Sequence, residues 1–247
     1  MRSLYRKYRP TKLTDVVGQS GVTTALQNAL LQDKIGHAYL FIGPRGTGKT
    51  SVARIFAHAI NKFDYQLEDN YLDIIEIDAA SNNGVDNIRD LREKAIIAPS
   101  QGKYKIYIID EVHMLSKSAA NALLKTLEEP PAHTVFIMAT TEADKIPITI
   151  TSRTQLYNFK LASLEVMSEH LTKIAKAEKI NITPDAITIV AERSGGSFRD
   201  ALSLLDQVAS LAGSRENPID ANFLRDALGL PSDQITHSLL KSYATGD

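Results

Sequence analysis

The sequence predicts an α/β protein in which a parallel sheet covered by helices is followed by a small all-helical domain. Two observations lead to this prediction. Up to about residue 160, short apolar runs alternate with stretches of helical periodicity, and such alternation is typical of a parallel sheet between two layers of helices. After residue 161 no stretch has the character of a strand, and helical patterns alone continue.

Five apolar runs are the expected strands: Ala38–Ile42, 73–78, Lys105–Asp110, Thr134–Thr140 and 156–160. Four of them are nearly continuous in apolar residues, which suits parallel strands that are buried on both faces. Between the runs, apolar residues recur at helical spacing in the ranges 51–60, 85–91 and 120–127. Pro130 ends the last of these helices because proline cannot continue a helix.

The helical domain is predicted from its capping residues. Cap-forming side chains precede four apolar periodic stretches: Ser163, Thr183, Ser197 and Asp220. Their oxygens accept the unpaired N–H groups of a first helical turn. Pro184 suits the first helical position, and Ser197 with Asp200 resembles a capping box. We therefore expect domains at residues 1–160 and 161–247.

Composition limits the class of protein. A chain of 247 residues with 43% apolar residues suits one large domain or two and is sufficient for a core. The net charge of −1 means that any nucleic-acid binding must come from a local patch. The absence of cysteine excludes disulfides and thiolate zinc sites. Without an apolar leader or a run long enough to span a bilayer, we expect a soluble, cytoplasmic protein.

Residues 43–50 (GPRGTGKT) match the phosphate-binding pattern GxxxxGK[ST] at every position, directly after one expected strand and before one expected helix. The glycines allow successive N–H groups to point into one concavity that holds phosphate oxygens, and the helix N-terminus adds a favourable dipole. Lys49 is expected to contact the β- and γ-phosphates, and Thr50 to bind Mg²⁺. The expected nucleotide-binding residues are Gly43, Arg45, Gly46, Thr47, Gly48, Lys49, Thr50 and Ser51.

Two further strands end in polar residues. Asp110 and Glu111 follow a buried strand, where open α/β sheets place their ligands. Asp110 suits Mg²⁺, and Glu111 suits a proton acceptor for the attacking water; the alternative is an acidic pair that caps a helix. Thr141 ends the next strand and is a candidate to hold the water, although such threonines are commonly only solvated. His113 is expected to be a hydrogen-bonded core residue, since a lone histidine is seldom a ligand.

Two arginines have both a structural and a functional interpretation. Arg153 precedes the last expected strand, where it either pairs with a surface carboxylate or acts in trans on the γ-phosphate of a neighbouring subunit. Arg199 lies in the first turn of a helix in the second domain, where a cation is mildly disfavoured. A function in sensing the nucleotide by lid closure would explain it.

Longer strings of residues resemble one family. These are YRKYRP (5–10), VGQ (17–19), the phosphate loop, DAASNNG (78–84), DEVHML (110–115) and NALLKTLEEPP (121–131). Together they resemble the AAA+ clamp-loader ATPases, and within that family the gamma/tau type of bacterial DNA polymerase III. The resemblance extends over essentially the whole chain. It implies a RecA-like sheet domain, a helical lid, and an oligomerising collar beyond this chain.

The resemblance also assigns roles to single residues. It implies that Thr141 is the first sensor, Arg199 the second sensor, and Arg153 the arginine that acts in trans. The segment on the adenine and ribose side matches Tyr8, Arg9 and Val17. Candidate DNA-phosphate contacts are Arg89, Lys125 and the helix N-termini after Ser81 and Ser116, although a lysine such as Lys125 is more often a solvated helix residue.

Two departures from the family matter. The interval 62–72, where the family usually has a four-cysteine zinc module, is short and acidic with no cysteine or histidine, so no zinc is expected. Thr154 replaces the cysteine of a Ser-Arg-Cys motif and leaves Arg153 in place. The related delta-prime subunit has a degraded phosphate loop, and the intact loop here argues against that assignment.

The function that the resemblance implies is an ATP- and Mg²⁺-dependent motor subunit within the polymerase III holoenzyme. Its expected partners are other clamp-loader subunits (delta, delta-prime and further gamma/tau copies), a sliding clamp and primed DNA, with no membrane. The isolated chain is expected to be monomeric. Two alternatives stay open: an AAA+ DNA motor of the branch-migration type, and a scaffold that holds nucleotide without hydrolysing it.

Overall fold

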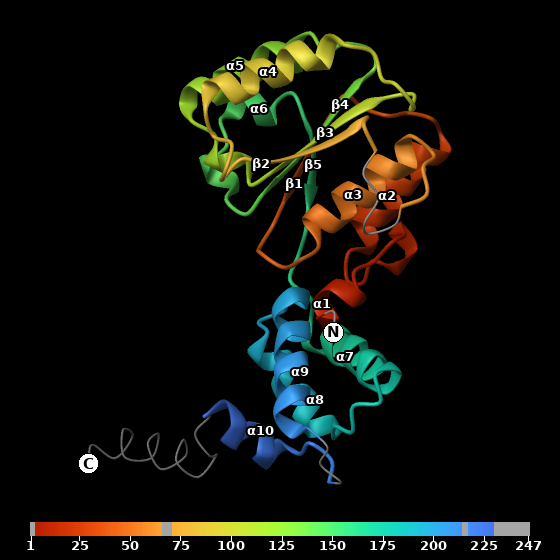
Figure 1. Cartoon of the computed structure of the whole chain (residues 1–247), viewed down its shortest axis with the longest axis vertical. Coiled ribbons are helices and arrows are strands. Elements are labelled where there is room, and N and C mark those ends of the chain that lie inside the picture. The colour runs from red at the N-terminus through yellow and green to blue at the C-terminus, as the bar shows by residue number, and fades with distance from the viewer. Residues whose placement is uncertain (1–2, 66–70, 214–216, 230–247) are drawn as a thin grey trace, which may run out of the picture. The chain divides into compact units, whose positions relative to one another are not determined.

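A computed structural model of the chain describes residues 3–65, 71–213 and 217–229 (Figure 1). These residues form two compact units, one within Arg9–Leu161 and the other made of residues 3–8 and 162–229. The division lies one residue beyond the expected boundary at residue 160. It also differs in assigning residues 3–8 to the helical unit, whereas the sequence interpretation had them in the sheet domain. The expected collar lies outside the described residues.

The described residues of the sheet unit form five parallel strands in the order β2-β3-β4-β1-β5. Their bounds are β1 (Ala38–Ile42), β2 (Ile74–Asp78), β3 (Lys105–Asp110), β4 (Thr134–Thr140) and β5 (Gln155–Asn158). The predicted fold class is therefore confirmed. Because β4 lies between β1 and β3, the carboxyl-terminal ends of these three strands, which carry the motifs, are neighbours.

Helices cover both faces of this sheet (Figure 1). On one face lie α4 (Val85–Ile96), α5 (Lys117–Glu128) and α6 (Ile148–Thr151); on the other lie α2 (Ser20–Leu31) and α3 (Lys49–Ile60). Successive strand residues point to opposite faces, so Leu40 of β1 joins the first core while Tyr39 and Phe41 join the second. This double burial explains why the strands are continuous apolar runs.

Short helical turns complete the sheet unit: η1 (Leu13–Asp15), η2 (Val112–Met114) and η3 (Ala143–Lys145). The sequence interpretation missed α2, although Val22 and Leu26 are buried one turn apart and Leu30 packs on the same core. Spacing of i, i+4 and i+8 marks an amphipathic helix and was the available indication. The helix has no side-chain N-cap, so a capping residue, the other usual indication of a helix, was absent from the sequence at that position.

Two strand boundaries also differ from expectation. β2 begins after Asp73, whose buried carboxylate instead accepts the N–H groups of Ser100, Gln101 and Gly102 at 2.6–2.7 Å. These hydrogen bonds hold the pKa of Asp73 below its usual range against the effect of burial. β5 ends at Asn158, two residues early, because the N–H of Lys160 leaves the sheet to donate to Gln19 Oε1 at 3.1 Å.

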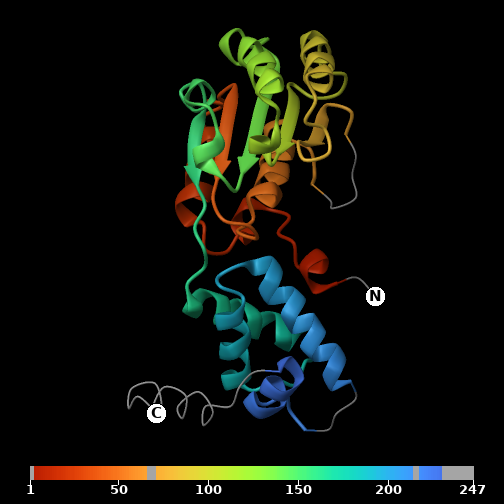
Figure 2. The same cartoon turned by 90° about the vertical axis from the view of Figure 1, so that its left-hand side faces the viewer.

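The helical unit contains α1 (Leu4–Lys7), α7 (Leu164–Ala177), α8 (Pro184–Arg193), α9 (Phe198–Ala212) and α10 (Ala221–Leu228) (Figures 1 and 2). All four predicted caps are formed: Ser163, Thr183, Ser197 and Asp220 each accept the N–H three residues later. The reciprocal half of the capping box at Ser197 is not formed, because the Ser197 N–H donates to the Ser194 carbonyl at 3.0 Å. No helix in the described part of the chain has the length and apolar character to cross a bilayer.

Candidate nucleotide-binding site

The phosphate loop follows β1 and turns sharply at three glycines. Gly43, Gly46 and Gly48 have φ values of 154°, 76° and 97°, in the region that glycine adopts without strain. At Gly43 a Cβ would lie 2.3 Å from the Phe159 carbonyl oxygen. The close approach of the chain that follows β5 therefore requires glycine at this position.

The loop presents unpaired donors. Among the described residues, no acceptor receives the backbone N–H groups of residues 46–51, and α3 begins at Lys49 with Gly48 as its N-cap. A helix N-terminus with free N–H groups is suited to bind an anion. The expected members of the loop are thus brought together, with Ser51 in the first turn of α3 and Arg45 exposed at the tip.

Lys49 is buried beneath this loop, with 6% of its surface exposed. Its Nζ donates to the carbonyls of Gly43 at 2.7 Å and Pro44 at 2.9 Å. Burial lowers the pKa of Lys49, and the nearby carboxylates of Glu111 and Asp110 oppose this effect. Lys49 therefore lies between the loop and the two acidic residues, where it is suited to contact a phosphate.

Asp110 and Thr50 bring two hard oxygen donors side by side. Thr50 Oγ1 donates to Asp110 Oδ2 at 2.8 Å, and the Glu111 N–H donates to Oδ1 at 3.0 Å. Burial raises the pKa of Asp110, while those two hydrogen bonds act in the opposite direction. A hydroxyl beside a half-buried carboxylate suits Mg²⁺, which prefers oxygen ligands and retains several waters.

We expect Asp110→Asn to stabilise the nucleotide-free protein. Because the pKa of Asp110 is raised in the folded state, the folded state binds the proton more tightly, and stability falls as pH rises through that pKa. An amide carries no charge to desolvate, so the melting temperature at pH 7 should rise. Thermal melting at pH 7 and at acidic pH tests this. The gain should shrink toward acid, and stabilisation by ATP with Mg²⁺ should be lost; a gain that grows toward acid contradicts the account.

Glu111 and Thr141 meet across the ends of β3 and β4. Thr141 donates to Glu111 Oε2 from its N–H at 3.3 Å and from Oγ1 at 3.1 Å. Glu111 itself has a left-handed backbone, with φ 48° and ψ 47°, which is uncommon for a residue other than glycine. The turn directs its carboxylate from β3 toward the end of β4 rather than along the strand.

Arg153 lies at the opposite end of the strands from the phosphate loop, where the parallel strands begin. It precedes β5, and Gln155 of β5 pairs in parallel with Tyr39 near the start of β1. From Tyr39 to the end of β1 is about 10 Å at about 3.3 Å per residue. The Arg153 guanidinium contacts Glu128 at 2.8 Å and the Thr149 carbonyl at 2.8 Å. The surface ion pair that the sequence left open is therefore present, and the phosphate loop of the same chain is out of reach.

The other expected site residues lie in different parts of the fold. Arg199 is in the first turn of α9, with its guanidinium 5.3 Å from the centre of the Tyr5 ring. Tyr8 belongs to the helical unit, where its hydroxyl donates to Glu178; this hydrogen bond raises the pKa of Tyr8 to about 12. Arg9 and Val17 belong to the sheet unit and are half-buried.

The candidate DNA contacts are exposed on neighbouring helices. Arg89 on α4 pairs with Asp86 of the same helix at 3.1 Å, and Lys125 is exposed on α5. Ser116 caps α5, as expected, by accepting the Ala119 N–H. The helix expected after Ser81 begins only at Val85, because residues 78–82 form a hydrogen-bonded turn on Asp78.

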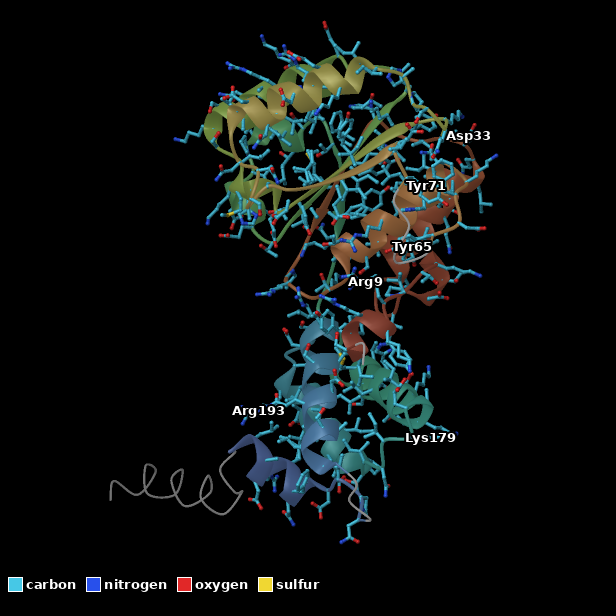
Figure 3. All side chains as sticks on the ribbon, in the orientation of Figure 1. Arg9, Asp33, Tyr65, Tyr71, Lys179 and Arg193 are labelled. Atoms are coloured by element: carbon cyan, nitrogen blue, oxygen red, sulfur yellow. The ribbon has the colours of Figure 1, made fainter. Side chains whose placement is uncertain are left out.

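Two features were not predicted. Gln19 is buried, donates to the Lys160 carbonyl at 2.7 Å and to the Thr47 carbonyl at 3.4 Å, and so joins the phosphate loop to the chain after β5. In the interval of the family's zinc module, Tyr65 and Tyr71 lie beside α3 and pack on His58, with ring centres 4.6 and 5.3 Å from it (Figure 3). The aromatic content of that interval was the available indication.

These features together define an AAA+ P-loop protein. The phosphate loop follows β1, the acidic pair lies at the end of β3, and the polar end of β4 lies between them. The sheet is parallel, and a separate helical unit accompanies it. Solved structures agree on this fold. The Thermotoga maritima RuvB Holliday junction branch migration motor is 20% identical, with a TM-score of 0.73 over 90% of this chain and 72% of that one. A point mutant of the same motor is 19% identical and has the same TM-score. At this identity the likeness concerns the fold alone.

Two family profiles match, one described as DNA polymerase III, delta subunit, over residues 18–163, and one as DNA polymerase III clamp loader subunit, ATPase lid domain, over residues 166–214. The chain belongs to the family of DNA polymerase III clamp-loader subunits. It is 51% identical over 92% of its length to DNA polymerase III subunit tau of Bacillus subtilis, covering 43% of that protein. It is 41% identical over 99% of its length to the gamma/tau subunit of Mycobacterium tuberculosis, covering 45% of that protein. The chain thus spans less than half the length of these relatives.

Proposed function

We propose that this protein is the ATP-hydrolysing motor subunit of a bacterial replicative clamp loader, which places a sliding clamp on primed DNA in the cytoplasm. The observation that carries the proposal is that the expected site residues are divided between the two ends of the parallel strands. Residues suited to bind nucleotide, cation and water gather at the carboxyl-terminal ends of the strands. Arg153 lies at the amino-terminal ends. Such a division suits a subunit whose active site is completed by its neighbour.

The chemistry assigned to these residues is attack of water on the γ-phosphoryl group. The N–H groups of the loop and Lys49 bind the phosphates, and Thr50 and Asp110 would hold Mg²⁺, which would supply positive charge to the phosphate group when bound. Thr141 holds one oxygen of Glu111, whose carboxylate accepts the proton of the water. The new oxygen–phosphorus bond forms as the bond to ADP breaks.

Residues outside this cluster complete the proposed cycle. Arg153 of a neighbouring copy would stabilise the charge of the transition state, and Arg199 would respond to nucleotide through the helical lid. Tyr8, Arg9 and Val17 are proposed for the adenine and ribose side. ATP binding would favour the arrangement that holds clamp and DNA, with Arg89 and Lys125 as phosphate contacts, and hydrolysis would release both. No zinc is expected to take part.

The two alternatives make different predictions. A branch-migration motor has the same fold, as its 0.73 TM-score indicates, but it should unwind or migrate DNA without a clamp. A nucleotide-holding scaffold needs neither a proton acceptor nor an arginine in trans. The identity of 51% to a tau subunit favours the clamp-loader function over both.

We expect Lys49→Ala to abolish clamp loading. The substitution removes the buried ammonium group from the phosphate loop, so ATP binding and turnover should fall together in the full-length protein assembled with the other clamp-loader subunits. The measurement is ATPase activity stimulated by clamp and primer-template, together with clamp loading on primed DNA. Loading at the wild-type rate by the Lys49→Ala assembly would refute the proposal, and unwinding without a clamp would favour the branch-migration alternative.

A further inference from the structure

His113 lies in η2 and bridges the ends of β3 and β4. Its side chain is only 5% exposed. Nδ1 lies 3.0 Å from Thr140 Oγ1 and 3.4 Å from Glu111 Oε2, and Nε2 lies 3.1 Å from Glu142 Oε1. These three polar partners belong to the two strand ends that carry Glu111 and Thr141.

The partners form one connected network. Thr140 Oγ1 also accepts the Glu142 N–H at 3.0 Å, and Glu142 in turn pairs with Lys145 at 2.7 Å. The Met114 N–H donates to the Glu111 carbonyl at 2.8 Å, which closes the turn that carries the histidine. A histidine that served only to fill the core would not need two carboxylates and a threonine from the catalytic edge of the sheet.

The network acts on one oxygen of Glu111. Oε2 faces His113 Nδ1 and accepts both donors of Thr141, at 3.1 and 3.3 Å. Within the described ranges no group donates to Oε1, which leaves that oxygen to accept a proton. A glutamate has three side-chain torsions, and a rigid imidazole against its carboxylate limits them. Positional errors of about 1 Å at a catalytic group can cost on the order of 100-fold in rate.

We infer that His113 is a positioning residue for ATP hydrolysis, which holds the Glu111 carboxylate against Thr141 so that Oε1 faces the attacking water. The inference rests on the proposed function, since it assumes that Glu111 is the proton acceptor. His113 touches neither nucleotide nor water in this account and acts through Glu111. Its loss should therefore lower kcat and leave ATP binding unchanged.

The test compares two substitutions that keep polarity, in the full-length protein assembled with its partner subunits. In His113→Asn the amide reaches the position of Nδ1, beside Thr140 and Glu111, whereas in His113→Gln it reaches the position of Nε2, beside Glu142. We expect Asn to retain most of the turnover and Gln to lose about 10- to 100-fold in kcat. The dissociation constant of a fluorescent ATP analogue should stay within about twofold for both. His133→Asn is the matched control, because His133 hydrogen-bonds to the Ala95 carbonyl, at 3.1 Å, rather than to a residue of the site.

The Glu111→Gln background separates this inference from the proposed function. If His113 acts through Glu111, His113→Gln should have no further effect on the residual turnover of Glu111→Gln. Equal losses in both backgrounds, a higher turnover for Gln than for Asn, or loss of ATP binding in proportion to kcat would overturn the inference. If Glu111→Gln itself leaves turnover unchanged, what fails instead is the part of the proposed function that makes Glu111 the proton acceptor.

Discussion

Arg153→Ala should reduce ATP turnover of the assembled clamp loader by about 10³- to 10⁵-fold, the range that trans-acting arginines contribute to phosphoryl transfer. ATP binding should be nearly unchanged. Arg153 precedes β5 and lies at the amino-terminal ends of the strands, whereas the phosphate loop of the same chain lies at the carboxyl-terminal end of β1. The own-chain partner of Arg153 is Glu128, in a surface ion pair at 2.8 Å. Such pairs contribute about 0–1 kcal/mol, so the fold should tolerate the loss.

Mixed assemblies decide whether the arginine acts in trans. A Glu111→Gln subunit has a defective site but supplies Arg153 to its neighbour, and an Arg153→Ala subunit has an intact site but supplies no arginine. In an assembly with both variants, the Arg153→Ala site beside a Glu111→Gln neighbour should regain turnover. If the arginine acts within its own chain, the mixture has no competent site and stays inactive.

An arginine outside the site provides the control for charge. Arg193 is exposed in the last turn of α8 (Figure 3), and Arg193→Ala should leave turnover unchanged. The same account predicts that the isolated chain hydrolyses ATP slowly, because no neighbour supplies Arg153. Turnover by a monomer as fast as that of the full assembly would contradict it.

Local patterns were sufficient to predict most of the fold. The strands are apolar runs because both faces of the sheet are covered, and the caps of α7 to α10 involve side chains within three residues of the N–H they accept. The phosphate loop was predicted for the same reason, since its geometry depends on glycines within one turn. Glu111 and Thr141 were both predicted as site residues from their positions at strand ends, and the two ends meet because β3 and β4 are parallel neighbours.

Contacts between distant segments could not be predicted in this way. Leu4 packs in the core of the helical unit, and its N–H donates to Asp206 at 3.3 Å, although 202 residues separate them in sequence. Gln19 meets Lys160 only because the chain after β5 returns past the phosphate loop. The partners of His113 likewise depend on how η2 orients the ring against β4. No local periodicity encodes such pairings.

Glu111→Gln should lower kcat by about 10²- to 10⁴-fold, the contribution expected of a general base, while ATP still binds. The amide is nearly isosteric, and its oxygen accepts the two hydrogen bonds that Thr141 donates to Oε2 at 3.1 and 3.3 Å. The substitution therefore keeps the geometry and removes only the ability to accept a proton. Single-turnover hydrolysis and binding of a fluorescent ATP analogue separate the two effects.

The outcome also distinguishes a motor from a scaffold. A motor that cannot hydrolyse ATP should bind clamp and DNA and fail to release them, because hydrolysis drives release; a scaffold should behave as the wild type does. Glu165→Gln is the matched control, since Glu165 is exposed in the first turn of α7. Unchanged turnover in the Glu111→Gln assembly would remove Glu111 from the mechanism. Loss of ATP binding would instead mean that the carboxylate supports the loop through Lys49. Burial lowers the pKa of that lysine, and the Glu111 charge lies close enough to oppose this effect.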